Sequence, residues 1–426
     1  MKIKVLFNFL VVALLLTSLY SCDQSQENSE DDVANATKTI SAKDILGNPK
    51  YLAMSYGGYR ENTRDAQPTI EELKEDMKIL SAMGVGIVRT YNVQLAQAAN
   101  LLEAIHQLKE ADPAFEMYVM LGAWIDCEGA WTEKPNHDKG DVEKNTAEIA
   151  RAVELANKYS DIVKVIAVGN EAMVKWAADY FVQPAVILKW VNHLQELKAT
   201  DKLPKETWIT SSDNYAAWGG EGDEYHVDDL NKLIEAVDYV SLHIYPMHET
   251  HYKPEFWGVF DGEEAKSDEE KIALAMERAI GFGIAQHDRT AAYIKGLGIE
   301  KSIHIGETGW ATSSDGFYGD NGTKATDEYK EGVFYKLMRD WTAKNNMSCF
   351  YFEAFNENWK DEKNPNGSEN FFGLFTIDGQ AKYALWDLVD AGNFEGLKRA
   401  GNIIGKTYDG DKEALMKEVK LPPSKK

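Results

Sequence analysis

Two stretches of this sequence decide its fold: Val-Ile-Ala-Val-Gly-Asn-Glu at residues 165–171 and Ile-His-Ile-Gly-Glu-Thr-Gly-Trp at residues 303–310. Each begins as an apolar run and carries a glutamate, Glu171 or Glu307, at the end of that run. A continuous apolar run is typical of a strand that is buried on both faces, as in a parallel sheet covered by helices. Barrel enzymes present their reactive groups at the carboxyl ends of such strands.

Working outward from these two stretches, eight apolar runs rich in β-formers can be counted. They lie near residues 51–56, 85–91, 117–121, 163–168, 207–211, 239–244, 302–306 and 349–355. Helical periodicity is present between them, near residues 142–159, 182–197, 267–297 and 326–342. The clearest helix starts at Thr69, which forms a capping box with Glu72, and it stops at Gly84.

This alternation, with no internal break in composition, predicts one (β/α)8 TIM barrel with elongated βα loops. A doubly wound open sheet is the competing topology, but Ser-Tyr-Gly-Gly-Tyr at residues 55–59 does not match its glycine-rich phosphate fingerprint. We place the catalytic domain at residues 42–400, with a long loop at 247–266 after the sixth strand. Residues 401–426 form a polar, Lys-rich tail that we expect to pack loosely.

The first 41 residues are not part of the predicted barrel. Residues 1–21 combine a basic start with an apolar stretch too short to span a bilayer, which indicates a lipoprotein signal peptide. Leu-Tyr-Ser-Cys at residues 19–22 resembles the lipobox of bacterial lipoproteins, and lipid chains on Cys22 would anchor the protein without a membrane span. An ordinary cleaved signal is the alternative.

Residues 22–41 are acidic and rich in Gln, Ser and Asn, a composition that predicts a disordered tether. The acidic residues after Cys22 resemble the surface-export tethers of Bacteroidetes lipoproteins. We therefore expect the protein at the cell surface or outer membrane, in contact with the membrane only through its lipid anchor.

Composition excludes several classes of partner. The formal net charge is -23, which argues against nucleic acid and against a polyanionic substrate, whereas a neutral polymer is unaffected. Apart from Cys22, the sequence has only Cys127 and Cys349, so no disulfide framework is implied. We expect a monomer that uses no cofactor and no metal.

Polar and aromatic residues follow the predicted strands, where a barrel gathers its functional side chains. This set is Arg89 and Tyr91, Asn170 and Glu171, His243 and Tyr245, Glu307 and Trp310, and Glu357, Trp359 and Lys360. Such a ring suits a neutral sugar polymer, whose hydroxyls need hydrogen-bond partners and whose ring faces stack on aromatic side chains. Two carboxylates facing one bond can cleave a glycosidic linkage. Within this set we assign His243 a structural role.

The motifs resemble glycoside hydrolase family 17, the β-1,3-glucanases, which belongs to a clan of retaining glycosidases on (β/α)8 barrels. The resemblance rests on Asn170-Glu171, on Gly-Glu-Thr-Gly-Trp at 306–310, on Arg-Thr-Tyr-Asn at 89–92, on Tyr245-Pro246 and on Phe-Asn-Glu-Asn-Trp-Lys at 355–360. It covers residues 51–388. One departure is Ala311, where the plant members have a proline after the tryptophan.

The resemblance implies a role for each matched residue. Glu171 is the acid/base and Glu307 the nucleophile, and Asn170 donates to the 2-hydroxyl of the sugar being cleaved. The cation of Arg89 and the phenol of Tyr245, both close to Glu307, favour the charged form of this carboxyl group. The remaining predicted substrate-binding residues are Tyr91, Trp310, Glu357, Trp359 and Lys360.

Our leading hypothesis is a retaining endo-β-1,3-glucan hydrolase that degrades laminarin-type polysaccharide by double displacement. A β-1,3-glucan transglycosylase shares the same chemistry, and a cellulase or mannanase of the same clan is a further enzyme alternative. A non-catalytic glycan-binding surface lipoprotein is an alternative from a different class. Such a protein should lack at least one of the carboxylates, and both are present.

Overall fold

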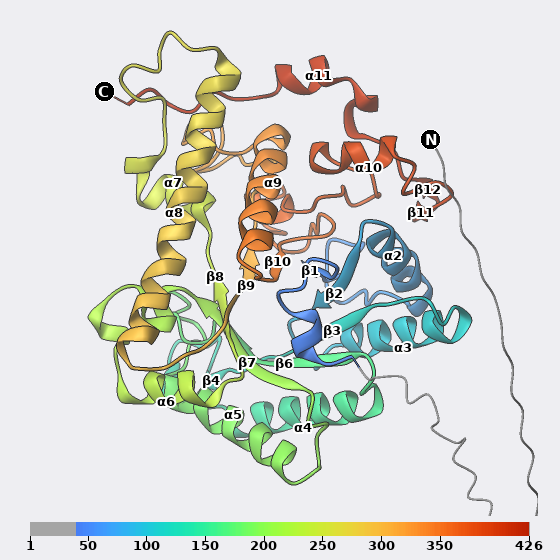
Figure 1. Ribbon diagram of the computed structural model, residues 1–426, viewed down its shortest axis with the longest axis vertical. Coiled ribbons are helices and arrows are strands. Elements are labelled where there is room, and N and C mark those ends of the chain that lie inside the picture. Colours follow the sequence, from blue (N-terminus) through green and yellow to red (C-terminus); the bar gives the residue numbers. More distant parts are fainter. Residues whose placement is uncertain (1–39, 426) are drawn as a thin grey trace, which may run out of the picture. The chain divides into compact units, whose positions relative to one another are not determined.

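Eight parallel strands close into a barrel in the computed structural model of the protein, which describes residues 40–425 (Figure 1). Around the barrel their order is β1-β10-β9-β8-β7-β6-β3-β2. The strands are β1 (Leu52–Ser55), β2 (Val85–Arg89), β3 (Tyr118–Ala123), β6 (Val163–Asn170), β7 (Trp208–Asn214), β8 (Val240–His243), β9 (Ile303–Thr308) and β10 (Cys349–Tyr351). The predicted (β/α)8 TIM barrel is confirmed. The signal peptide, Cys22 and the tether up to residue 39 lie outside the described residues.

Helices surround the barrel (Figure 1). The longer helices are α2 (Ile70–Ala82), α3 (Ala96–Ala111), α4 (Val142–Lys158), α5 (Pro184–Ala199), α6 (Asp228–Ala236), α8 (Asp268–Gly296) and α9 (Glu328–Lys344). The shorter ones are α1 (Ala42–Ile45), α7 (Pro246–Tyr252), α10 (Trp386–Asp390) and α11 (Lys412–Lys417). Two small antiparallel pairs complete the described chain: β4 (Cys127–Glu128) with β5 (Asn136–Gly140), and β11 (Lys398–Arg399) with β12 (Asn402–Ile403).

A polar N-cap begins most of the helices that the sequence revealed. The capping box of Thr69 and Glu72 begins α2 as expected, and Ser267 with Glu270 begins α8 in the same way. The sequence analysis did not identify α3 and α6. Their N-cap residues, Leu95 and Val227, make no side-chain cap hydrogen bond, so neither helix has a polar start signal.

The short helix α1 packs at the amino-terminal end of the barrel. Its residues Ala42 and Ile45 are fully buried in one cluster with side chains of the strands, among them Ala53 and Ile87. The backbone N–H after this helix, at Gly47, donates to Ser348 Oγ just before β10 (2.9 Å). One end of the barrel is therefore filled with apolar side chains, and the loops at the carboxyl ends of the strands form the other end.

Two βα loops are elongated, as expected, but the longer one is not irregular throughout. The loop after β3 carries the β4–β5 pair, and the segment after β8 contains α7 and a 3-10 turn at Pro254–Phe256. Proline at the first position of α7 starts this helix, because its fixed backbone angle suits a first helical turn. The expectation of a long loop over all of residues 247–266 is thus wrong for its first half.

The carboxyl-terminal segment 401–425 packs on the barrel domain, which corrects the expectation of a loosely packed tail. Leu415 of α11 is fully buried, and Ile404 is nearly so. The backbone of Ser424 forms a parallel bridge with Val259 in the segment after β8, as the path of the chain end in Figure 1 shows. The apolar residues of segment 401–425 form short groups, such as Ile403-Ile404 and Ala414-Leu415-Met416, among many polar and charged residues, so the overall composition did not reveal these contacts.

A buried charge cluster joins the last part of the domain to α2. Asp76 of α2 is completely buried and accepts from Arg399 of β11, with Nε at 2.9 Å and Nη2 at 3.1 Å. The same carboxylate accepts from Tyr56 Oη (2.9 Å) and from Arg60 Nη2 (3.0 Å). Removing one partner from such a buried pair leaves an incompletely compensated charge away from water.

We therefore expect Arg399→Met to lower the free energy of unfolding by about 3 kcal/mol, measured by urea denaturation. Lys398→Met is the matched control, because Lys398 is exposed on the same strand, and it should change stability little. Equal stability of the two variants would contradict a structural role for the Asp76–Arg399 pair.

Candidate active site

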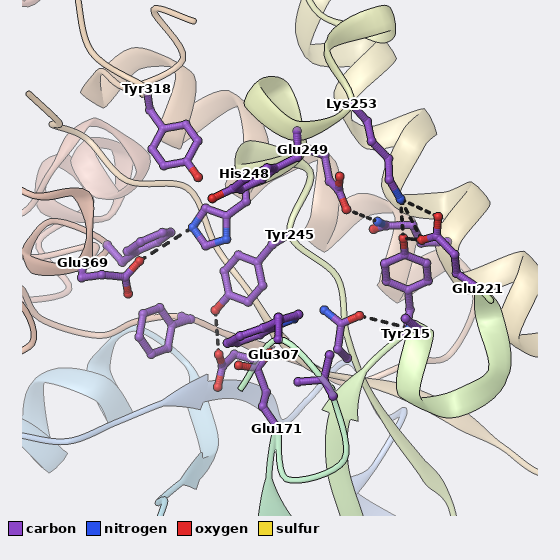
Figure 2. Close-up of a pocket in the computed structure, with 18 of the residues that line it drawn as sticks. Glu171, Tyr215, Glu221, Tyr245, His248, Glu249, Lys253, Glu307, Tyr318 and Glu369 are labelled. Atoms are coloured by element: carbon purple, nitrogen blue, oxygen red, sulfur yellow. Dashed lines mark hydrogen bonds and ion pairs between the residues drawn. The ribbon is translucent and has the colours of Figure 1, made fainter. Parts of the chain in front are cut away.

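Glu307 lies at the carboxyl end of β9, where only 7% of its surface is exposed. Arg89 Nη1 from β2 and Tyr91 Oη both donate to its Oε2 at 2.8 Å. Tyr245 Oη, just after β8, donates to Oε1 at 2.8 Å (Figure 2). Two strands, β2 and β8, and the residues just after them thus supply one cation and two phenols to a single carboxylate.

These contacts determine the charge of Glu307. Burial alone would raise the pKa of this carboxyl. The positive charge of Arg89, that of His243 when it is protonated, and the hydrogen bonds from Tyr91 and Tyr245 together hold the pKa below its ordinary value. Glu307 is therefore an anion near neutral pH.

Glu171 follows β6 and has a left-handed backbone conformation (φ 45°), which is unusual for a residue with a side chain. Its backbone N–H donates to Ser212 O of β7 (2.9 Å), and Gly169 before it also has a positive φ. The chain after Glu171 is held by the buried Asp213, whose Oδ2 accepts from the N–H of Met173 (2.7 Å). Neighbouring elements therefore maintain this backbone conformation.

The electrostatic environment of Glu171 is the opposite of that of Glu307. Burial, followed by the nearby negative charge of Glu307, raises the pKa of Glu171 from 4.5 to about 8. Glu171 is therefore mainly protonated near neutral pH, while Glu307 is charged. One cavity thus holds both a proton donor and an anion.

Asn170 and Arg89 lie together between the two carboxyl groups. Arg89 Nη2 donates to Asn170 Oδ1, and Arg89 Nη1 also donates to the backbone oxygen of Gly306 (2.8 Å). Because Asn170 Oδ1 accepts from the guanidinium, its amide nitrogen remains as the group that can donate outward. This orientation is the one that the predicted contact with a sugar hydroxyl requires.

His243 belongs to the site, although the sequence analysis assigned it only a structural role. Its Nε2 lies 2.7 Å from Ser212 Oγ and 3.2 Å from Arg89 Nη1, and a guanidinium can only donate. Nε2 is therefore the acceptor and Nδ1 carries the hydrogen, 3.1 Å from Glu171 Oε1. Burial lowers the pKa of His243 to about 4, so the ring is neutral. His243 and Tyr245 are two residues apart, so their side chains lie on the same side of an extended chain. This spacing was the signal in the sequence that could have placed His243 in the site.

The predicted residues after β10 form a supporting cluster beside the cavity. Lys360 Nζ pairs with Glu353 (2.9 Å), which the sequence analysis missed, and with Glu357 (3.5 Å). Trp359 Nε1 donates to Glu357 Oε2 (2.9 Å). The Lys360 cation also lies 4.1 Å from the ring centroid of Phe352, which does line the cavity. Glu357, Trp359 and Lys360 are thus brought together, and Lys360 joins this cluster to Phe352 of the cavity wall.

Trp310 is not part of this site, which corrects the expectation of a sugar platform. Its side chain is 0% exposed, and Nε1 donates to the backbone oxygen of Ala325 (2.8 Å). The ring packs against Trp257 and Phe334. Although Trp310 follows Glu307 by three residues, the chain has by then turned into the layer between the barrel and its outer helices.

A cavity of ≈ 750 Å³ contains both Glu171 and Glu307 (Figure 2). The sequence analysis missed most of its wall, which is largely aromatic. Tyr245 stacks on His248 (centroids 5.0 Å apart, 15° between planes), and His248 is followed by Tyr318 (5.5 Å, 30°). Tyr245 and His248 lie at the start of the short helix α7 and Tyr318 lies in the loop after β9, where no long periodic pattern marks the side chains that face inward.

Within residues 40–425, no group of three or more His, Cys, Asp or Glu side chains could hold a metal ion. Cys127 and Cys349 are buried free thiols. None of the helices in this part of the chain is long and apolar enough to cross a membrane.

Comparison with known proteins defines the class. The BtgE/BtgC glycoside hydrolase domain matches residues 53–373, so the chain belongs to this family of glycoside hydrolases. The crystal structure of an endo-laminarinase from Formosa Hel1_33_131 has 66% sequence identity and a TM-score of 0.90, and the match covers 91% of this chain and 98% of that one.

Fungal relatives are more distant. The glucan 1,3-beta-glucosidase of Arthroderma benhamiae is 27% identical over 320 residues, which are 73% of this chain and 83% of the relative. The putative glucan endo-1,3-beta-glucosidase btgC of Aspergillus niger is 24% identical over 71% of this chain, and the match spans only 37% of that relative.

The raised pKa of Glu171 predicts a pH-dependent stability. In the unfolded chain this carboxyl ionises near its ordinary value of 4.5, whereas the folded protein holds the proton until about 8. Wild-type stability should therefore fall as the pH rises between these values. Glu171→Gln cannot ionise at this position. Its free energy of unfolding should therefore rise relative to that of wild type by on the order of 2 kcal/mol between pH 5 and 8, measured by chemical denaturation.

Glu154→Gln, at an exposed position of α4, is the matched control and should show the same pH dependence as wild type. If the difference in free energy of unfolding between Glu171→Gln and wild type stayed the same over this pH range, the electrostatic description of Glu171 would be contradicted.

Proposed function

We propose that the protein is a retaining endo-β-1,3-glucanase that hydrolyses laminarin-type polysaccharide, with Glu307 as nucleophile and Glu171 as acid/base. The observation that carries this proposal is the opposite protonation of two carboxyl groups in one cavity. A glycosidase needs this difference, because one carboxyl group must give a proton while the other supplies negative charge.

In the first step, the Glu307 carboxylate attacks the anomeric carbon and the bond from that carbon to the glycosidic oxygen breaks. Glu171 gives its proton to this oxygen, and the leaving sugar departs with a hydroxyl group. In the second step, Glu171 takes a proton from water, the water oxygen attacks the anomeric carbon and Glu307 is released. The product keeps the configuration of the substrate.

The neighbours of the two carboxyl groups have clear tasks in this scheme. Arg89, Tyr91 and Tyr245 hold Glu307 in place through hydrogen bonds and keep it charged. The outward amide of Asn170 donates to the 2-hydroxyl of the sugar that is attacked, an interaction that strengthens in the transition state. Glu357 and Lys360 support the wall of the cavity from behind.

Two findings support β-1,3-glucan as the substrate. The Formosa protein, 66% identical, is an endo-laminarinase, and the fungal relatives are named for β-1,3-glucan cleavage. The strongly acidic chain and the aromatic cavity wall favour a neutral polysaccharide. We also propose that the protein belongs to glycoside hydrolase family 17, whose motifs the chain resembles. We further propose that it acts as a monomer, because one chain supplies every residue of the site.

We further propose that the enzyme is a surface lipoprotein anchored at Cys22. The basic, apolar start followed by Leu-Tyr-Ser-Cys at residues 19–22 supports this location. So does the acidic, polar stretch at residues 23–41. An extracellular polymer as substrate is consistent with an enzyme held outside the cell.

Glu307→Gln should reduce the rate of laminarin hydrolysis by about 10⁴-fold or more while binding survives, because the neutral amide keeps the shape of the side chain and cannot attack. Product release from β-1,3-, β-1,4- and mixed-linkage glucans is measured by chromatography, and binding by calorimetry. Glu154→Gln is the control for the change of charge alone.

Full activity of Glu307→Gln would disprove the assignment, and an initial product of inverted configuration in proton NMR would disprove retention. Preferred cleavage of β-1,4-glucan would favour the cellulase alternative. Products longer than the starting oligosaccharide would show that the protein is a transglycosylase.

Cys22→Ser should release the protein from the membrane fraction, because the serine cannot carry the lipid. Detergent partitioning and protease treatment of whole cells measure the anchoring and the exposure at the surface. A variant that stays in the membrane fraction would contradict lipidation at this residue.

A further inference from the structure

The cavity extends beyond the part that the proposed mechanism uses. From Glu171 and Glu307 it continues over the loops after β6, β7 and β8 and ends against α8 (Figure 2). The lining of the cavity also includes Trp176 from the loop after β6, Tyr252 from α7 and Gln286 from α8, none of which matches a motif of the sequence.

Gln286 of α8 is the most informative residue at this end. It is completely buried, and its Nε2 donates to Glu249 Oε1 (3.1 Å). Its Oε1 is also buried and has no hydrogen-bond partner among the described residues. An unsatisfied buried carbonyl is costly, and a hydroxyl group entering the cavity would satisfy it.

Besides the carboxyl group of Glu249, the cavity lining holds an ion pair. Lys253 Nζ contacts both carboxylate oxygens of Glu221 at 2.7 Å and the hydroxyl of Tyr215 at 2.9 Å (Figure 2). This ion pair connects the loop after β7 to the end of α7. The ion pair and the Tyr215 hydroxyl offer donors and acceptors to a ligand rich in hydroxyl groups.

Two large aromatic side chains at the same end are open to solvent. Trp176 is 64% exposed and Tyr252 is 65% exposed, although both line the cavity. The loop that carries Trp176 is held in place, because the N–H of Lys175 donates to Tyr225 Oη (3.0 Å) and Lys175 Nζ donates to Glu224 O (3.1 Å). An exposed ring on a loop that is held in place is suited to stacking on the apolar face of a sugar.

We propose that this end of the cavity binds the leaving part of the glucan chain. Gln286 accepts a hydrogen bond from a glucosyl hydroxyl, and Trp176 and Tyr252 stack on the glucosyl units that follow. The assignment of this side rests on the proposed function: Glu171 protonates the oxygen of the leaving sugar, so that sugar lies on the side of Glu171. The cavity continues from there along the loops after β6 and β7.

The test compares two substrates with the purified enzyme. Laminarihexaose fills both sides of the cleavage point, whereas a 4-nitrophenyl β-laminaribioside has a phenol in place of the leaving sugars. Trp176→Ala should lower kcat/KM on the hexaose by about three- to tenfold, mainly through KM, and leave the aryl glycoside unchanged. Gln286→Leu should show the same pattern, and Trp176→Phe should restore most of the loss.

The matched control is Trp131→Ala. Trp131 is similarly exposed (59%) on the loop after β3, but it stacks on Tyr180 and does not line this cavity. It should behave as wild type with the hexaose. If Gln286→Leu fails to fold, Trp176→Ala still decides, because its side chain is on the surface.

Equal losses on both substrates would overturn the proposal, since they would place Trp176 with the reacting groups. No loss on the hexaose would overturn it as well, and so would the same loss in Trp131→Ala. Failure of the proposed function is a different outcome, because the wild-type enzyme would then cleave neither substrate.

Discussion

The site depends on one buried guanidinium. Arg89 is almost fully enclosed by the barrel, and a buried cation is tolerated only when charge and hydrogen bonds compensate it. It meets this need with Glu307, the oxygen of Gly306 and Asn170, and it fixes the hydrogen of His243 on the side of Glu171. Arg89 therefore positions Glu307 directly and Glu171 through His243.

The same contacts separate the two carboxyl groups electrostatically. Arg89 lies directly on Glu307, whereas Glu171 is contacted by a neutral imidazole and is exposed to the negative charge of Glu307. Burial opposes ionisation at both positions, and a close cation overcomes it at only one. Of two chemically identical side chains, Glu171 therefore carries a proton and Glu307 is charged. The residues that produce this difference come from the ends of β2, β6, β8 and β9.

The sequence predicted those parts of the protein that repeat or carry a motif. The barrel and the groups on Glu307 could be inferred because strands have a period and their ends are fixed positions. Trp310 could not be placed, since a residue three positions past Glu307 can face the cavity or the helical layer. His243 needed its contacts with Ser212 and Arg89 to be seen as part of the site. The aromatic wall and the packing of residues 401–425 depend on loop conformations, which no local pattern encodes.

The fold also determines where the residues before Ile40 join the barrel. The chain enters the described domain at Ile40, directly before α1, and α1 fills the amino-terminal end of the barrel. The cavity opens at the opposite end, where the carboxyl ends of the strands lie. Any attachment made through the residues before Ile40 therefore joins the barrel at its amino-terminal end, which α1 fills. With a lipid on Cys22, as proposed, the chain that leads to the anchor would start at the end opposite the cavity and would not have to cross its mouth.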